Sequence, residues 1–312
     1  MDLDTKLVRH FFTVVEAMSS TSTTTAASKA RRRRLIRPHP AISIAEEMNP
    51  SRRSNMEDVH VALQPGDDDD AWDSPEYALT AVYDGHGGRD IVDYLERHLS
   101  RNLAQELAHD DDAADVATRI ERALLLTDIQ SRRANLMTSG STVVLCLTKR
   151  ASADPGAAVT IHAANCGDAR ATLSCAVGPG GAACPSRATR LTFDHRADDE
   201  GETARIEAAG GFVYGKRVLG ILAVARSLGD HGLKEYVIAK PYVSETVMTK
   251  AEGQFIIVAC DGLWDVMDDQ PAVDMVREIA ATHPRDAVAD ILVQEAVKRG
   301  STDNITAIIA WL

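Results

Sequence analysis

The chain has 312 residues and an ordinary globular composition, in which 45% of the residues are hydrophobic and 26% are charged. This length fits one large domain or two modest ones, and it excludes a small disulfide-stabilised protein. No apolar run approaches the length of a membrane-spanning helix, and aromatic residues make up only 4% of the chain, which argues against a stacking surface for single-stranded nucleic acid.

The charge is unevenly distributed along the chain. Residues 1–40 carry a net charge of +5, which leaves −17 for residues 41–312 out of a total of −12. A body this acidic repels phosphate backbones, so we expect no nucleic-acid partner. If the protein handles phosphate groups at all, a recruited positive charge must be present, and metal ions are the obvious candidates.

The N-terminal segment differs in composition from the rest. Residues 19–30 are a low-complexity run of Ser, Thr and Ala, and four consecutive arginines follow at 31–34. We expect residues 1–40 to be a flexible basic extension and residues 41–312 to be one folded domain. The arginines can serve as a nuclear signal, and a mitochondrial transit peptide stays open, although three acidic residues count against it. With no secretory leader, we expect a cytoplasmic or nuclear location, or both.

The five cysteines give no sign of a disulfide framework. Their number is odd, and no Cys-x-x-Cys pair occurs. Cys146 and Cys260 lie inside apolar runs, which favours buried free thiols in a reducing compartment over disulfides or a zinc site.

Apolar periodicity predicts strands and helices that occur in groups. In chain order we expect strands at 42–45, 59–63 and 77–83, a turn at 84–88, helices at about 89–107 and 113–134, strands at 141–147, 158–164 and 169–175, a loop over 176–188, a short helix at 202–209, a strand at 255–260, helices at about 271–281 and 285–298, and a last strand at 305–312. Helices come in consecutive pairs between clustered strands. This order predicts an α+β fold in which two stacked antiparallel sheets carry helix pairs on their outer faces, and it disfavours a doubly wound parallel sheet.

Acidic residues stand at the ends of several predicted apolar strands. Each of them alone is most simply a turn residue. Antiparallel strands, however, bring residues that are distant in sequence to the same end of a sheet, where four or five carboxylates would repel one another without a cation. Hard divalent cations such as Mg²⁺ or Mn²⁺ prefer oxygen ligands of this kind. The carboxylates concerned are Glu57, Asp58, Asp84, Asp261 and Asp303.

Three residues close to these carboxylates in the sequence suit phosphate chemistry: Arg53 before Glu57, and Gly85 and His86 after Asp84. Gly85 allows the backbone to come close, so its carbonyl can also bind a metal. His86 is more often structural when it stands alone, but beside several carboxylates it is a plausible proton donor. Arg53 can bind phosphate oxygens as a bidentate donor, although it can also be a plain surface arginine.

Nine short motifs follow one another in a fixed order. They lie at 53–58 (Arg-Ser-Asn-Met-Glu-Asp), 82–88, 139–142, 164–170, 191–195, 202–206 with 210–211, 222–230, 259–265 and 302–304. In sequence and order they resemble the motifs of the type 2C protein phosphatases, the metal-dependent Ser/Thr phosphatases. The resemblance covers most of the chain, and nine motifs in one order make a chance match very improbable.

The resemblance implies a four-layer α-β-β-α sandwich with a two-metal centre at one end. Asp84 would bridge two Mg²⁺ or Mn²⁺ ions. Glu57 and the Gly85 carbonyl would bind one ion, and Asp261 and Asp303 the other.

It also implies roles for further residues. Asp58 would hold a metal-bound water, and Asp168 would bind a third, more weakly held ion together with Asp261. Arg53 would bind the substrate phosphate, and His86 would protonate the leaving oxygen. The implied reaction is hydrolysis of phosphoserine and phosphothreonine in proteins by direct attack of a water or hydroxide that the two metals activate. Residues 41–312 would form this catalytic domain.

One departure from the family pattern stands after Asp194 and His195. The family usually has Lys-Pro at this point, whereas this chain has Arg196-Ala197. The change bears on substrate preference more than on activity.

Two alternatives remain: a catalytically silent scaffold on the same fold, and a metal-dependent phosphohydrolase for small molecules. We expect phosphoprotein substrates, no membrane or nucleic-acid partner, and a monomer.

Overall fold

A computed structural model describes residues 42–312 except 66, 68–71, 110–113, 153, 155–156, 178–182 and 249–252. The predicted extension over residues 1–40 lies outside the described residues. Within the described ranges, no helix is both long enough and apolar enough to cross a bilayer.

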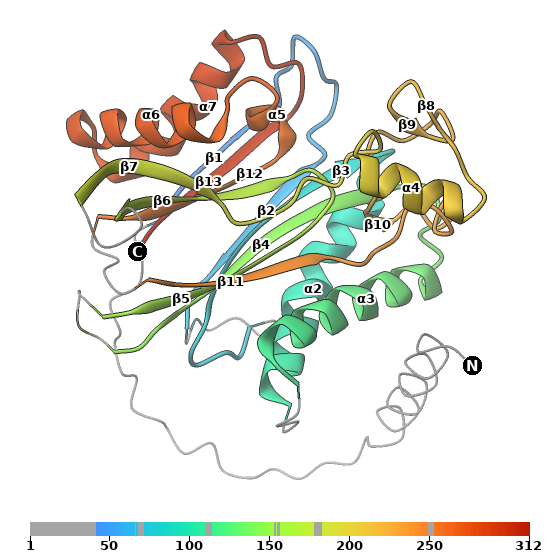
Figure 1. The fold of residues 1–312 in the computed structure, drawn as a ribbon, viewed down its shortest axis with the longest axis horizontal. Helices are drawn as coiled ribbons and strands as arrows, with labels where there is room; N and C mark the ends of the chain where they lie inside the picture. Colours follow the sequence, from blue (N-terminus) through green and yellow to red (C-terminus); the bar gives the residue numbers. More distant parts are fainter. Residues whose placement is uncertain are drawn as a thin grey trace. The chain divides into compact units, whose positions relative to one another are not determined.

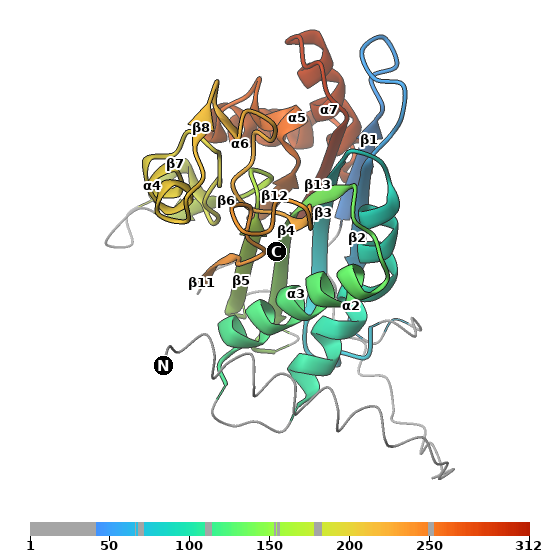
Figure 2. The same ribbon diagram turned by 90° about the vertical axis from the view of Figure 1, so that its right-hand side faces the viewer.

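Two antiparallel sheets form the centre of the fold (Figures 1 and 2). The first has the strand order β1-β13-β12-β6-β7, and the second has the order β11-β5-β4-β3-β2, with β10 paired to β4. A separate hairpin joins β8 and β9. The strands are β1 (Ile42–Glu47), β2 (Asp58–Leu63), β3 (Ala78–His86), β4 (Gly140–Arg150), β5 (Val159–Cys166), β6 (Arg170–Val177), β7 (Ala183–Arg190), β8 (Val213–Tyr214), β9 (Arg217–Val218), β10 (Leu228–Gly229), β11 (Tyr242–Met248), β12 (Phe255–Ala259) and β13 (Ile305–Trp311).

The central strands carry apolar side chains on both faces, because one face packs against helices and the other against the opposite sheet. In β3, Ala81 and Tyr83 pack into the core beneath the helices of the second sheet, whereas Val82 packs between the two sheets. Val258 and Ile308 of the first sheet belong to the same inter-sheet core as Val82. Side chains of alternate residues therefore fill alternate layers, as the strand period of two requires.

Helix pairs form the two outer layers (Figures 1 and 2). The helices α2 (Asp90–Ala108) and α3 (Val116–Arg133) cover the second sheet, and α6 (Asp269–Thr282) and α7 (Val288–Lys298) cover the first. Leu95, Leu99 and Leu103 recur every four residues on α2 and are buried against the second sheet. The predicted four-layer α+β sandwich is confirmed.

The predicted turn at 84–88 is partly wrong, because β3 continues through Asp84, Gly85 and His86. The pairing with β4 continues just as far, and His86 lies opposite Gly140. The turn begins only at Gly87, whose φ of 72° is the left-handed conformation that glycine adopts without strain. The polar residues at this strand end therefore have fixed strand geometry.

Two edge strands escaped the sequence analysis. Residues 183–190, part of which was predicted to be a loop, form β7 at one edge of the first sheet, and β11 at the edge of the second sheet was not predicted. Edge strands face solvent along one side and carry polar residues, such as Ser244 and Glu245 in β11, so the apolar pattern that marks a strand is weak in them.

The segment between Leu191 and β11 forms a small subdomain with its own core. It contains α4 (Glu200–Ala208), the β8/β9 hairpin and β10. The Asp199 side chain accepts hydrogen bonds from two backbone N–H groups and so caps α4. Two short helical elements complete the fold: α5 (Asp261–Trp264) and the 3₁₀ helix η1 (Arg285–Ala287). The core of the subdomain consists of Ala197, Ile206, Val218, Ala225 and Val237.

Candidate metal centre

Antiparallel pairing collects the predicted carboxylates at one end of the sandwich. β2 begins where β3 ends, and Asp58 lies directly opposite Asp84. In the other sheet, β13 begins where β12 ends, and Asp261 and Asp303 lie just beyond these two strand ends. Each sheet therefore contributes a pair of aspartates to the same rim.

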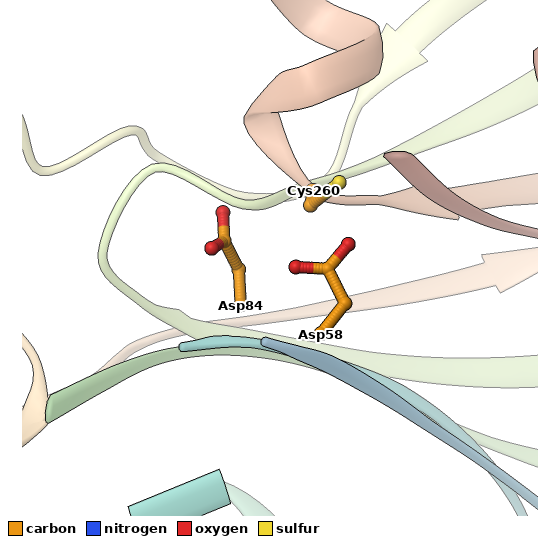
Figure 3. A group of neighbouring side chains, drawn as sticks. All are labelled: Asp58, Asp84 and Cys260. Carbon is orange, nitrogen blue, oxygen red and sulfur yellow. The ribbon is translucent and has the colours of Figure 1, made fainter. Parts of the chain in front are cut away.

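The carboxylates of Asp58 and Asp84 point from the second sheet toward the end of β12 (Figure 3). One oxygen of each and the Cys260 sulfur lie within 4.8 Å of one another. Asp58 Oδ2 accepts a hydrogen bond of 2.7 Å from the Thr306 hydroxyl, which fixes one side of this carboxylate. Thr306 belongs to β13, so this bond also joins the two sheets at the rim.

Cys260 was expected in the core, but its place beside the two carboxylates was not foreseen. Cys146, Cys166 and Cys260 are all buried and free of disulfides, in agreement with the predicted free thiols. Burial raises the pKa of the Cys260 thiol well above its ordinary value, and the charges of Asp58 and Asp84 raise it further. Such a thiol stays protonated near neutral pH and is a poor nucleophile.

Burial and mutual repulsion dominate the electrostatics of this rim. Burial raises the pKa of Asp84 well above its usual range, and the charges of Asp261, Asp58, Asp168 and Asp303 raise it further. The pKa of Asp261 is raised in the same way. Burial raises the pKa of Asp58 to about 7, although its hydrogen bond from Thr306 opposes the shift. A cluster of buried oxygen ligands that repel one another matches the hard-ligand preference of a divalent cation.

Glu57 lies close to β3 because Gly85 has no side chain. The Gly85 N–H donates to the Glu57 carbonyl over 3.2 Å, and the Gly88 N–H donates to Glu57 Oε1 over 2.9 Å. A Cβ atom on Gly85 would lie 2.6 Å from the Glu57 carbonyl oxygen and 2.7 Å from Val92 Cγ1. The lack of a side chain at Gly85 therefore lets the backbone of residue 57 approach β3, and metal binding by the Gly85 carbonyl stays a prediction.

Asn304 holds the loop before β2 in place, a role that the sequence analysis missed. Its Oδ1 accepts a hydrogen bond of 2.9 Å from the Glu57 N–H. Its Nδ2 donates to the carbonyl oxygens of Met48 and Asn55 over 2.8 and 3.1 Å. The motif at 302–304 contains this residue, but one sequence does not show that an amide next to an aspartate fixes a loop 250 positions away.

Asp168 lies at the same rim but has a basic partner. Arg196 Nε lies 3.6 Å from Asp168 Oδ2, and the same guanidinium pairs with Asp265. Burial raises the pKa of Asp168 to about 6, and the positive charge of Arg196 opposes the shift. Arg196 is one of the two residues that depart from the family pattern. Because it pairs with Asp168, any cation at Asp168 would share this carboxylate with a guanidinium of the chain itself.

Arg53 and His86 both lie at the rim with acidic partners. The half-exposed Arg53 side chain pairs with Asp303, and its Nε donates to the Thr302 carbonyl over 3.3 Å. His86 Nε2 lies 2.7 Å from Asp230 Oδ2. Burial alone would raise the pKa of Asp230, but hydrogen bonds from His86 and from Ser227 outweigh it and hold this pKa below its ordinary value. Asp230 is the last residue of the motif at 222–230, and the sequence alone assigned it no role.

Comparisons with known proteins agree with this architecture. The family model for protein phosphatase 2C matches residues 43–305. Protein phosphatase 2C homolog 1 of Schizosaccharomyces pombe is 35% identical over 278 residues, which cover 86% of this chain and 72% of that protein. Protein phosphatase 2C homolog 1 of Saccharomyces cerevisiae is 32% identical over 280 residues, or 87% of this chain and 93% of that protein.

Solved structures give the same result for the fold. A C. elegans sex determining protein matches with a TM-score of 0.73 and 25% identity, over 88% of this chain and 65% of that one. A phosphatase from Toxoplasma gondii matches with a TM-score of 0.70 and 23% identity, over 87% of this chain and 92% of that one, and supports the fold alone.

The four-layer sandwich, its acidic rim and the similarity over most of the chain together define a class of enzyme, the metal-dependent protein serine/threonine phosphatases. Within this class, the chain belongs to the protein phosphatase 2C family.

The raised pKa values predict how stability depends on pH in the absence of metal. Asp58 and Asp168, with pKa values of about 7 and about 6, keep protons in the folded state that the unfolded chain releases near pH 3.8. Their contribution to the free energy of unfolding in EDTA should therefore fall as the pH rises from about 4 to about 7, by about 1.4 kcal/mol for each unit of pKa shift. Buried His195, whose pKa is lowered to about 4, contributes in the opposite direction. Urea unfolding at several pH values measures this fall.

Two comparisons sharpen this experiment. Saturating Mg²⁺ should reduce the fall, because a bound cation takes the place of the protons. Asp58→Asn should also reduce it in EDTA, because one of the titrating groups is gone. The same pH dependence in EDTA for the wild type and for Asp58→Asn would contradict the raised pKa of Asp58.

Gly85→Ala should loosen the rim. The added methyl group would collide with the Glu57 carbonyl and Val92, so we expect a loss of roughly 1–3 kcal/mol in stability and weaker binding of Mn²⁺. Urea unfolding and titration calorimetry measure the two effects. Gly232→Ala is the matched control, since a Cβ atom there would meet nothing within 4 Å. Equal behaviour of the two variants would show that the close approach at Gly85 is unimportant.

Proposed function

We propose that the acidic rim binds two Mg²⁺ or Mn²⁺ ions and that a third ion binds more weakly at Asp168. Glu57, Asp84 and the Gly85 carbonyl would hold one ion, and Asp84, Asp261 and Asp303 the other. Asp58, fixed by Thr306, would orient a water molecule. When bound, the ions lower the pKa of coordinated water and neutralise charge on the phosphate. The cluster of buried and half-buried carboxylates that repel one another is the observation that carries this proposal.

The remaining steps belong to side chains of the chain itself. Arg53 is half-exposed at the rim, and its guanidinium can turn from Asp303 to a phosphate oxygen as a charged donor. The oxygen that leaves is a serine or threonine alkoxide, which is strongly basic. His86 would give it a proton, and general acid catalysis of this kind typically contributes about 10²–10⁴-fold. Cys260 takes no part as a nucleophile, because burial and nearby charges keep its thiol protonated.

Asp261→Asn tests the metal centre. This residue follows β12 and its pKa is raised by burial and by Asp168, Asp265 and Asp303, so the change should remove Mn²⁺-stimulated hydrolysis of a phosphothreonine peptide. It should leave the metal-free fold intact or more stable, because a repulsive charge is gone. Activity with and without EDTA, together with urea unfolding, measures both effects.

The controls for this experiment separate the alternatives. Asp274→Asn alters an exposed aspartate on α6 and should retain wild-type activity. Full activity of Asp261→Asn would contradict the metal centre. A folded wild-type protein without turnover would favour the silent scaffold, and a higher kcat/KM on a sugar phosphate than on the phosphopeptide would favour a small-molecule phosphohydrolase.

We further propose that the protein acts as a monomer on phosphoproteins, without a membrane or nucleic-acid partner, in the cytoplasm or nucleus. The net negative charge of residues 41–312 supports the absence of a nucleic-acid partner. The arginine run at 31–34 supports a nuclear address. Imaging the full chain beside a chain that lacks residues 1–40 tests the address. An unchanged distribution would assign no targeting role to this segment, and a mitochondrial pattern that depends on it would favour the transit peptide.

A further inference from the structure

His86 has a buried acidic partner that the proposed mechanism leaves unused. Its Nε2 lies 2.7 Å from Asp230 Oδ2, and the Asp230 side chain is only 9% exposed. The Ser227 hydroxyl donates to the same carboxylate oxygen. In the described part of the chain, His86 Nδ1 has no hydrogen-bond partner, so it is the ring nitrogen that remains for substrate.

Three adjacent strands create this contact. His86 at the end of β3 lies opposite Gly140 of β4, and Gly140 in turn lies opposite Gly229 of β10. Asp230 is the next residue along the chain. A Cβ atom on Gly140 would lie 2.1 Å from Asp230 Oδ2 and 2.4 Å from His86 Nε2. The imidazole and the carboxylate therefore meet directly over a residue that has no side chain.

The backbone at Asp230 is held in an uncommon conformation. Its φ is 45°, in the left-handed region that few non-glycine residues adopt. Its N–H donates to the Ser139 carbonyl over 3.0 Å, which fixes the residue to the start of β4. Strained residues of this kind persist where the surrounding contacts fix them, and they occur often at active sites.

A second group of bonds holds β10 from the side away from His86. Asp128 of α3 accepts a hydrogen bond of 2.8 Å from the Gly229 N–H. Lys234 Nζ lies 3.1 Å from the same Asp128 oxygen and donates to the Ser227 carbonyl over 3.0 Å. These bonds support the segment that carries Asp230 without touching the imidazole, so they offer a control for a purely structural effect.

We propose that Asp230 is a positioning residue for phosphoester hydrolysis, which holds the His86 ring by Nε2 so that Nδ1 donates to the leaving oxygen. As a bond forms between the water oxygen and phosphorus, the bond between phosphorus and the serine or threonine oxygen breaks. The electron pair goes to that oxygen, which takes the Nδ1 proton and leaves as a hydroxyl group. His86 is left neutral, with its remaining proton on Nε2 and hydrogen-bonded to Asp230. This inference rests on the proposed role of His86.

The test uses substrates whose leaving groups need a proton to different degrees. A phosphothreonine peptide loses a strongly basic alkoxide, phenyl phosphate a weaker base, and 2,4-dinitrophenyl phosphate a base so weak that it needs no proton. In the Mn²⁺-loaded protein, Asp230→Asn should lower kcat at least about 10-fold on the peptide, progressively less on phenyl phosphate, and less than about 3-fold on the dinitrophenyl ester. His86→Gln should give the same order of losses, and the double variant should be no worse than His86→Gln alone.

Control variants separate positioning from folding. Asp128→Asn disturbs the attachment of β10 without touching His86, so any loss should be equal on all three substrates. Ser227→Ala removes only the second hydrogen bond to Asp230 and should give a smaller loss with the same dependence on the leaving group. If Asp230→Asn does not fold, as judged by urea unfolding, Ser227→Ala alone decides the matter.

Two results would overturn the proposal. Equal losses on all three substrates for Asp230→Asn, or losses that multiply with those of His86→Gln, would give Asp230 a structural role only. A loss of kcat in Ser227→Ala that is the same for all three leaving groups would also contradict the proposal. Wild-type protein that fails to hydrolyse the phosphopeptide would contradict the proposed function itself, and this outcome is visible before any variant is made.

Discussion

One unfavourable interaction constrains the rest of the structure, the repulsion among buried and half-buried carboxylates at one end of the sandwich. Asp58 and Asp84 approach from one sheet, and Asp261 and Asp303 from the other. Burial raises the pKa values of three of these groups, and the neighbouring charges of the cluster raise them further. The rest of the domain keeps these groups together in spite of that cost, because the two sheets and their helix layers bury the apolar surface that stabilises the fold.

The two sheets contribute different kinds of control to this rim. In the second sheet, β3 carries Asp84 and His86 on one rigid strand, so the spacing between the cluster and the histidine is set by backbone geometry. In the first sheet, the short helix α5 begins at Asp261, and Asn304 holds the loop that carries Glu57. The small subdomain between β7 and β11 adds Arg196 beside Asp168 and Asp230 beside His86. The charged partners of Asp168 and His86 therefore come from the subdomain, while the carboxylate cluster comes from the two sheets.

The sequence was sufficient to predict the layers of the fold and the carboxylates at the strand ends. It was insufficient to predict the contacts that orient the side chains of the rim. Strands such as β12, which are apolar throughout, and helices such as α2 carry strong periodic signals. Edge strands β7 and β11 do not, because they carry exposed polar residues such as Arg187 and Glu245. The partners of His86 and Asp168 depend on pairings between strands and loops far apart in sequence, which no local pattern encodes. Cys260 shows the same limit, since an apolar neighbourhood predicts burial but not that carboxylates lie beside it.

The glycine at position 140 separates two requirements of the site, the binding of cations and the placement of the histidine. A methyl group there would lie within 2.4 Å of both the His86 ring and the Asp230 carboxylate. Neither group can keep its place against such an overlap. A chain with alanine at this position could retain every acidic residue of the rim and still bind cations with no histidine in place to protonate a departing alkoxide. Under the proposed mechanism, a complete set of acidic residues would account for cation binding only, and a glycine opposite the histidine would be a separate requirement for turnover.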